Sequence, residues 1–578
     1  MGRRRYEADH PSYKWVALSN TTLGVLMATV NASIVIISLP AIFRGIGLNP
    51  LGAGNVSYLL WTLMGYLVVS AVLVVTLGRL GDMFGRVKVY NLGFVVFTVA
   101  SLILVADPLH GSGGALWIIV GRVVQGVGGA MLMANSTAIL TDAFPSHQRG
   151  MALGINQVAA IAGSFLGLII GGVLSEWHWR AIFLVSVPIG IFGTTWSYRS
   201  LQELGVKRRG RLDVPGNITF AVGVTSILVA ITYGIQPYGG ATMGWTNPWV
   251  LLGLIGGSIV LVAFALIENR VSDPMFSMGL FKIKAFSAGN FAGLLASIGR
   301  GGMQFMLIIW LQGIWLPLHG YSFESTPLWA GIYLLPLTVG FLIAGPSSGF
   351  MSDRVGARAF ASGGLLITAA TFVGLILIPV DFNYTVFAAL LFINGIGSGM
   401  FSAPNTTAIM NSVPANQRGA ASGMRATFFN SGTSLSIGIF FSLMIVGLAA
   451  HLPTALRMGL VAQHVAPSVA NTVAGLPPVG SMFAAFLGFN PIQSLLGPTG
   501  ALKRVPAANA QTLTGQEFFP HLLSGPFHSG LVVVFTAAAV MMVVAAIASL
   551  LRGGHYVHDD DARPESMPRA GDDARQHA

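Results

Sequence analysis

Three arginines stand inside long apolar stretches of this chain, where a charged side chain needs a compensating environment. Arg122 is followed three residues later by Gln125, so the two side chains share one face of a helix. Arg300 lies about 14 residues into its apolar stretch, roughly 20 Å at helical rise, and Arg425 lies within another stretch. A charged arginine near the centre of a bilayer costs roughly 3 kcal/mol, so we expect each one to face a cavity or a partner. Such groups would bind a polar or charged molecule without reacting with it.

Amide and acidic side chains refine this picture. Gln304, Asn405 and Asn430 supply polar groups for a central site around Arg300, although Arg300 could instead bond backbone carbonyls. Asn31 can hydrogen-bond a ligand but cannot exchange a proton near neutral pH, and a plain polar link between helices is an equal alternative. All 20 Asp and Glu residues fall in polar segments or at the ends of apolar ones. We therefore expect no carboxylate deep in the membrane.

The residue patterns that catalysis, metal binding or nucleotide binding would need are absent from the sequence. The chain has no cysteine, which excludes disulfides and thiol nucleophiles, and its histidines lack metal-ligand spacing. No Gly-x-x-x-x-Gly-Lys loop is present, so we expect no ATP hydrolysis, no cofactor and no enzymatic activity. The net charge of +11 comes from basic residues in short loops between apolar stretches, which does not indicate nucleic-acid binding.

The elements that position these residues are membrane spans. The chain of 578 residues is 53% hydrophobic and only 9% charged, where soluble domains carry roughly 25% charged residues. At about 20 residues per crossing, this predicts an all-α polytopic membrane protein in contact with the lipid bilayer. Fourteen spans are predicted, at residues 15–43, 56–77, 88–107, 114–140, 150–174, 181–201, 216–236, 248–267, 286–316, 327–350, 359–379, 384–411, 419–449 and 528–552.

Charge in the loops predicts the orientation. Lys and Arg gather in every second loop, beginning with the loop after the second span, and the alternate loops are poorer in them. Under the positive-inside rule both termini, residues 1–14 and the charged tail 553–578, are cytoplasmic. The tail carries a run of acids at 559–561 and is predicted to be disordered.

Two short charged turns share one pattern at an offset of 271 residues. In each, small residues let two helices approach, and a glycine can adopt the positive φ of a sharp turn. In the first, we expect Asp82 to face the N-terminus of the following helix and Arg86 to pair with it. The residues of the two turns are Gly78, Asp82, Gly85 and Arg86, then Gly349, Asp353, Gly356 and Arg358.

The repeat extends beyond these turns and divides the chain into two related halves. The motif at 125–128 matches 394–397, and 148–150 matches 417–419, both at an offset of 269. We expect six-helix bundles at residues 15–206 and 286–552, joined by a linker, 207–285, that holds two inserted spans. Residues 450–527 are predicted to be an extracytoplasmic loop. Its apolar pieces are interrupted by proline and glycine, so packing on the membrane surface is preferred over a flap above the transport path.

The duplicated turn resembles the loop signature of the major facilitator superfamily of membrane transporters. Fourteen spans with two inserted in the middle resemble its drug:proton antiporter-2 branch, whose members include multidrug-efflux proteins. The stretch from Gly121 to Ala130 is similar to the family's arginine motif, in which the arginine lines the central cavity. That resemblance implies a substrate or proton role for Arg122, although it could also extend toward a lipid headgroup.

Two positions depart from the family pattern. Asn31 stands where the branch usually has an aspartate, and Leu168 stands where the antiporter motif has a proline. The latter weakens the inference of antiport. The glycines of that motif still form a smooth stripe for helix packing, at Gly163, Gly167 and Gly171.

The resemblance implies a secondary transporter of a bacterial cytoplasmic membrane that exports hydrophobic or drug-like small molecules, coupled to protons, by alternating access. Two alternatives stay open. The arginines without membrane acids suit a uniporter or an exporter of anionic amphiphiles or lipids. A non-transporting receptor or assembly factor could also use this fold, with residues 450–527 as its binding module.

Overall fold

The computed structural model describes residues 10, 12–52, 54–205, 213–271, 274–414, 417–497 and 500–552, and their side chains except at 146, 147, 149, 150, 353–355 and 419. Residues 1–9 and the predicted disordered tail lie outside this part. The described chain is helical, with no β-structure beyond an isolated bridge between Tyr238 and Ala241. Fourteen of its helices, or continuous helix pairs, are long and apolar enough to cross a membrane, as predicted.

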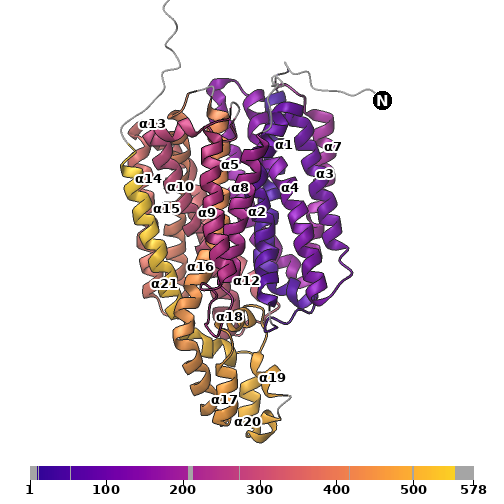
Figure 1. The fold of residues 1–578 in the computed structure, drawn as a ribbon, viewed down its shortest axis with the longest axis vertical. Coiled ribbons are helices and arrows are strands. Elements are labelled where there is room, and N and C mark those ends of the chain that lie inside the picture. Colours follow the sequence, from indigo (N-terminus) through magenta and orange to yellow (C-terminus); the bar gives the residue numbers. More distant parts are fainter. Residues whose placement is uncertain are drawn as a thin grey trace, which may run out of the picture.

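The spans form two sets of six, separated in the sequence by an inserted pair (Figure 1). The first set consists of α1 (Tyr13–Gly45), α2 (Asn55–Phe84), α3 (Arg86–Val105), α4 (Gly111–Ala143), α5 (Ser146–Trp177) and the broken helix α6 (Ala181–Leu184) with α7 (Ser186–Ser200). The inserted pair is α8 (Val214–Gly234) and α9 (Pro248–Glu268). The second set begins with α10 (Lys284–Trp310), which continues through the π-turn η2 (Leu311–Trp315) into α11 (Leu316–Leu318). It goes on with α12 (Thr326–Tyr333) leading into α13 (Leu335–Val355), then α14 (Ala357–Leu377), α15 (Tyr384–Asn411), α16 (Arg418–Ala462) and α21 (Phe518–Leu550).

The two sets repeat the same close helix contacts. A Cβ at Gly78 of α2 would lie 3.5 Å from the Cβ of Ala134 on α4, and one at Gly349 of α13 would lie 3.5 Å from that of Ala403 on α15. These pairs are related by offsets of 271 and 269 residues, so the sequence repeat is also a structural one. Small residues at these crossings let the backbones approach closely.

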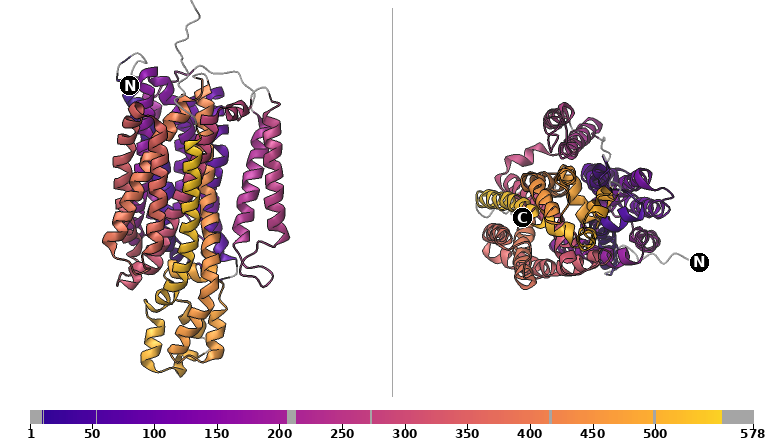
Figure 2. Two further views of the ribbon diagram at one scale, coloured as in Figure 1. Left: turned by 90° about the vertical axis from the view of Figure 1, so that its left-hand side faces the viewer. Right: turned by 90° about the horizontal axis from the view of Figure 1, so that it is seen from below.

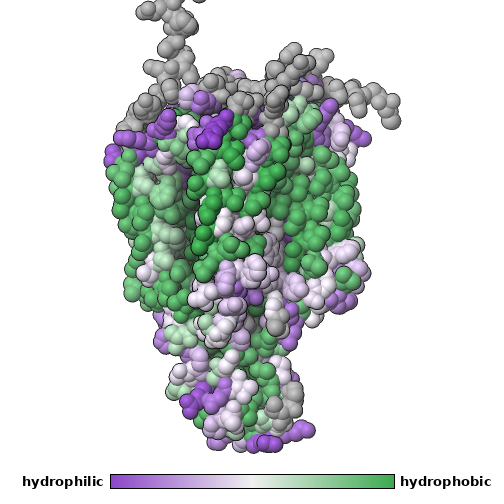
Figure 3. All heavy atoms as spheres, viewed as in Figure 1, coloured by the Kyte–Doolittle hydropathy of each residue, from purple (hydrophilic) through white to green (hydrophobic). Residues whose placement is uncertain are grey.

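The inserted helices stand beside the two sets (Figure 2). α8 packs on α2, α16 and α9. Only 17% of the most apolar window of α9 is buried within the protein, so most of this helix faces outward. On the face shown in Figure 3, hydrophobic side chains cover most of both sides of the molecule, paler residues lie near the lower centre, and hydrophilic ones gather at the two ends. This distribution fits a bilayer around the flank.

The two ends differ in structure. We call the end that carries Gly85 and Gly356 the charged-turn end. The other, the α18 end, carries the segment between α16 and α21, whose helices are α17 (Pro467–Ala474), α18 (Pro478–Phe486), α19 (Pro491–Leu496), η4 (Ala501–Arg504) and α20 (Ala507–Thr514). α16 and α21 themselves extend past the predicted span limits, to Ala462 and from Phe518.

The apolar piece 479–487 does not pack on a membrane surface. Every residue of α18 is buried, and α18 contacts η2, α16 and α21 of the second set and α2 of the first. Phe483 stacks on Phe441 of α16 with ring centroids 4.8 Å apart. α18 therefore covers the α18 end of the spans, while α17, α19 and α20 project beyond it (Figure 1). The preference for surface packing was wrong because pattern alone cannot distinguish a buried short helix from an interfacial one.

Candidate functional site

Arg122 lies in a closed polar cluster within the first set of helices. Its Nη1 donates to Gln125 Oε1 at 2.7 Å and to Asn31 Oδ1, and its Nε donates to the Thr62 carbonyl at 3.4 Å. Its guanidinium carbon also lies 4.4 Å from the ring centroid of Tyr66. The sequence-predicted trio of Arg122, Gln125 and Asn31 is thus brought together from α4 and α1.

The remaining bonds of this cluster also stay within the first set. Asn31 Nδ2 donates to Ser186 Oγ at 3.1 Å, and Gln125 Nε2 donates to Ser101 Oγ at 2.9 Å. Arg122 is 1% exposed, and both amides are fully buried. None of the three lines the cavity described next. In this conformation they link α1, α2, α3, α4 and α7 to one another.

One cavity lies within the second set of helices. Its lining comes from α10, α14, α15, α16 and α21, with Gln157 of α5 as the contribution of the first set. Among the predicted site residues, Arg300, Asn405 and Arg425 line it. Gln304 and Asn430 are half-buried and do not line it.

Arg300 enters the cavity from α10. Its guanidinium carbon lies 4.8 Å from the ring centroid of Phe341, a cation–π contact. In the described part of the structure, no hydrogen bond or ion pair holds Arg300. The alternative in which Arg300 bonds backbone carbonyls is therefore not what the structure shows.

Arg425, Asn405 and Arg552 cluster nearer the charged-turn end. Arg425 Nη1 donates to Thr406 Oγ1 at 3.3 Å. Arg552 Nη2 donates to Asn405 Oδ1, and Asn405 Nδ2 donates to the Gly289 carbonyl at 3.1 Å. Burial lowers the pKa of Arg552 to about 10, which still leaves it charged at neutral pH. Sequence reasoning missed Arg552 although it is the last residue of the predicted span 528–552, because an arginine at the end of a span normally extends to the headgroups.

Asn394 was missed as a site residue although the repeat pointed to it. It lines the cavity, and its Nδ2 donates to Thr371 Oγ1 at 2.7 Å. This bond repeats the one from Gln125 to Ser101, at offsets of 269 and 270 residues. The counterpart of Gln125 was therefore available from the sequence.

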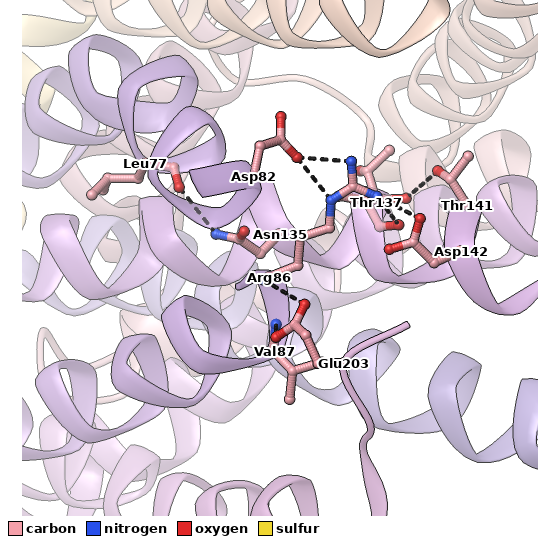
Figure 4. Close-up of polar contacts among 10 residues, drawn as sticks. Leu77, Asp82, Arg86, Val87, Asn135, Thr137, Thr141, Asp142 and Glu203 are labelled. Atoms are coloured by element: carbon pink, nitrogen blue, oxygen red, sulfur yellow. Dashed lines mark hydrogen bonds and ion pairs between the residues drawn. The ribbon is translucent and has the colours of Figure 1, made fainter. Parts of the chain in front are cut away.

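The first charged turn is held by ion pairs across three helices (Figure 4). Arg86 Nε lies 2.8 Å from Asp82 Oδ1, and Arg86 Nη1 lies 2.5 Å from Asp142 Oδ1. Gly85 has φ 118°, which a side chain would strain. Asp82 is in the last turn of α2, so it pairs with Arg86 as predicted but does not cap α3. That role belongs to Glu203, which accepts the backbone N–H groups of Arg86 and Val87 at 2.8 and 3.1 Å.

The second charged turn repeats the backbone of the first. Gly356 has φ 100°, and Arg358 is exposed. Asp353 is predicted to belong to this turn, and its side chain lies outside the described part.

The glycine stripe of α5 packs on α1 within the first set. A Cβ at Gly163 would lie 3.2 Å from the Leu26 carbonyl oxygen, and one at Gly167 would lie 2.4 Å from that of Val30. Gly171 faces α1 in the same way. One residue later α5 also contacts the second set, where a Cβ at Gly172 would fall 2.5 Å from the Cα of Leu328 on α12.

A buried carboxyl pair holds the inserted helices at the charged-turn end. Asp213 caps α8 by accepting the Gly216 N–H at 2.9 Å, and Glu268, at the end of α9, accepts the Phe276 N–H at 2.9 Å. A Cβ at Gly216 would lie 2.1 Å from Asp213 Oδ2 and 2.7 Å from Glu268 Oε1, so the two carboxyl groups lie close together. The described residues contain no group of three or more His, Cys, Asp or Glu side chains that could hold a metal ion.

Comparison with known proteins identifies the family. The Major Facilitator Superfamily profile matches residues 21–211 and 211–437. The chain belongs to the major facilitator superfamily. This is a family of transporters, not of enzymes, and the protein is a multi-pass membrane protein with bacterial homologues.

The similar curated proteins are distant but cover most of the chain. The tetracenomycin C resistance and export protein of Streptomyces glaucescens is 28% identical over 90% of this chain and 88% of its own. The multidrug transporter protein MdtP of Bacillus subtilis is 26% identical over 90% and 91%. The riboflavin transporter RibZ of Clostridioides difficile is 28% identical over 74% and 88%. The predicted recognition as a major facilitator is confirmed, and the similar proteins are of the fourteen-helix drug:proton antiporter-2 type.

Solved structures confirm the fold alone. A bacterial homologue of the human lysosomal transporter Spinster, inward-facing and unoccupied, superimposes with a TM-score of 0.53 at 14% identity. That match covers 94% of this chain and 99% of the other. The peptide transporter POT in complex with sulfate gives a TM-score of 0.54 at 14% identity, over 86% and 96%.

Proposed function

We propose that this facilitator exports hydrophobic or drug-like small molecules across a bacterial cytoplasmic membrane by alternating access, coupled to protons. The charged-turn end carries the basic loops, so it is assigned to the cytoplasm with both termini. The bundle boundaries at 15–206, 207–285 and 286–552 are proposed with it.

The observation that supports this function is the position of the cavity relative to the closed end. Three side-chain hydrogen bonds join the two sets at the α18 end. Gln312 Nε2 donates to the Ile37 carbonyl at 3.1 Å, and Arg44 donates to the carbonyls of Leu487 and Phe323 at 3.2 and 3.4 Å. The cavity lies toward the charged-turn end: Arg425, which lines it, is seven residues from the start of α16 at that end. A substrate would then enter from the cytoplasm.

Proton coupling rests on family resemblance and has one structural candidate. No Asp or Glu lines the cavity in the described part. The paired carboxyl groups of Asp213 and Glu268 could share a proton. Phe276, whose N–H bonds Glu268, lies with its ring centroid 6.3 Å from that of Phe428, a cavity-lining residue. These contacts connect a protonatable pair to the cavity wall.

Flux in proteoliposomes tests the proposal. Vesicles containing the full chain are given a pH gradient, and movement of a lipophilic cationic dye is compared with that of cholate, an anionic amphiphile. We expect transport that the gradient accelerates and that a protonophore abolishes. Flux indifferent to the gradient would instead favour the second candidate, a uniporter or exporter of anionic amphiphiles, which the cavity arginines support. No flux of either compound would overturn the proposal.

Arg300→Ala is the informative variant for this assay. We expect it to insert and purify normally but to lose transport, because Arg300 has no structural bond to lose. Arg457→Gln is the matched control, since Arg457 is an exposed residue of α16 near the α18 end. Full transport by Arg300→Ala would assign Arg300 a structural role.

A further inference from the structure

The cavity of the second set carries positive charge that its own walls do not neutralise. Arg300 and Arg425 line it, and Arg552 lies directly behind Asn405, which also lines it. No Asp or Glu is among the lining residues in the part of the chain that the structure describes. Each guanidinium stays charged at neutral pH.

Most of the hydrogen-bond donors on these arginines are unused. A guanidinium has five N–H donors. Arg425 uses one N–H donor in its hydrogen bond to Thr406, and its buried Nε has no partner in the described structure. Arg552, 5% exposed, donates from Nη2 to Asn405 and Ser549, while its Nε and Nη1 are buried without partners in the described structure. Arg300 has only the ring of Phe341.

Leaving such groups unpaired is expensive. A buried charge without a partner costs several kcal/mol, and an unsatisfied buried donor adds about 1–3 kcal/mol. A carboxylate, sulfate or phosphate group would offset these costs, because its oxygens match the planar fork of arginine. A cation would add repulsion.

The arginines lie at two depths. Arg425 is seven residues into α16 and Arg300 is sixteen residues into α10, which places them roughly 10 and 24 Å from the ends of these helices at the charged-turn end. The walls around them are largely apolar and include Phe372, Phe428 and Met542. A ligand that satisfies both features has an anionic group on an apolar body.

We propose that this cavity binds amphiphiles through an anionic group, with Arg425 as the ligand nearer the charged-turn end and Arg300 as the ligand at mid-depth. The inference rests on the proposed transport function and specifies its substrate class. Arg552 acts as a positioning residue, because it holds the Asn405 side chain away from the anion and adds charge behind it.

Direct binding tests this inference without any transport. The full-length protein in dodecyl maltoside is examined by equilibrium dialysis with three probes: cholate as an anionic amphiphile, inorganic phosphate as a free anion, and methyl viologen as a cation. The variants are Arg300→Gln, Arg425→Gln, the charge-retaining Arg300→Lys and the control Arg457→Gln. Size-exclusion profiles identify any variant that fails to fold.

We expect cholate to bind the wild type and Arg457→Gln equally, and at least tenfold more weakly to Arg300→Gln and Arg425→Gln. Arg300→Lys should recover part of the loss, because charge remains although the fork is absent. Phosphate binding that depends on the same arginines, without cholate binding, would assign the site to a free anion. It would overturn the proposal that the ligand is an amphiphile. Cholate binding that ignores both arginines, or tighter binding of methyl viologen, would overturn the anion site.

A failed flux assay with intact cholate binding would reject the transport mechanism while leaving the anion site. Gradient-driven flux of a cation without cholate binding would reject the anion site while leaving the transport mechanism. The two proposals can therefore fail separately.

Discussion

Buried arginines play different parts in the two halves of this facilitator. Arg122 donates hydrogen bonds to Asn31, Gln125 and the Thr62 carbonyl inside a buried cluster. Arg300 occupies a comparable depth with no polar partner in the described residues. A satisfied arginine stabilises the fold, whereas an unsatisfied one is available to a ligand. The first role predicts a stability effect and the second an effect on binding.

Substitution of Arg122 tests this division. Arg122→Ala should lower the free energy of unfolding by about 1–3 kcal/mol for each amide left unpaired, because both Asn31 and Gln125 are buried. Arg122→Lys should recover little, since an ammonium cannot reach the same partners as the planar fork. Thermal unfolding in detergent measures the effect, with Arg457→Gln as control. An unchanged melting temperature with lost transport would instead give Arg122 the substrate role that family resemblance implies.

At the scale of elements, glycines decide where helices turn and where the halves touch. Gly85 takes a positive φ between α2 and α3, where Arg86 ties the turn to Asp82 and Asp142. Gly172 lets α5 meet α12 at the α18 end. The first kind of glycine is required by the backbone conformation and the second by the space available. Their substitution should therefore have different consequences.

Gly85→Ala should destabilise the protein. We expect a loss of about 1–2 kcal/mol, because an L-residue is strained at positive φ, and the new Cβ would lie 2.6 Å from Glu203 Oε2. Gly256→Ala is the control, since Gly256 sits in α9 with open space around it. Chemical unfolding in micelles compares the two. Equal stability of both variants would mean that the turn adopts another conformation.

Gly172→Leu should shift the protein away from the conformation described here. A side chain at this position meets the Leu328 backbone, which no rotamer change relieves. Spin labels on cysteines at positions 176 and 324, both exposed at this end, report the separation of α5 and α12. We expect a longer label distance in Gly172→Leu than in the control Gly256→Leu. The absence of native cysteine makes the labelling specific. A distance that stays the same would show that this contact does not hold the end closed.

At the scale of the whole molecule, α18 belongs to the closure of the α18 end. α18 contacts mainly the second set, through η2, α16 and α21. Its contacts with the first set are fewer and include Gly480 beside Leu51. When this end opens, α18 should therefore travel with the second set and leave the first.

A cross-link between α18 and the first set should stop transport. A Cβ at Gly480 would lie 3.7 Å from Leu51 Cδ2, an ordinary contact, so the pair Gly480→Cys and Leu51→Cys can be joined without a clash. We expect a bifunctional thiol reagent with a reducible bond to block flux in the double variant, and a reductant to restore it. Neither single variant should respond. Continued flux after complete cross-linking would mean that α18 stays with the first set throughout the cycle.

The sequence by itself determined the fourteen spans, the two related halves and the charged turns. These features are local. A segment inside the bilayer has no water to bond its backbone and must be an apolar helix, and a tight turn needs glycine. It also singled out Arg300, Asn405 and Arg425, because a polar residue in an apolar stretch is conspicuous wherever it points.

Tertiary structure decided which of these residues have hydrogen-bond partners and what closes the α18 end. The bond between Arg122 and Asn31 joins residues 91 positions apart, and that between Arg552 and Asn405 joins residues 147 apart. Burial of α18 and the capping of α3 by Glu203 depend equally on distant segments. A side chain's free donors are set by the neighbours that folding brings to it, and composition or spacing along one helix does not contain that information.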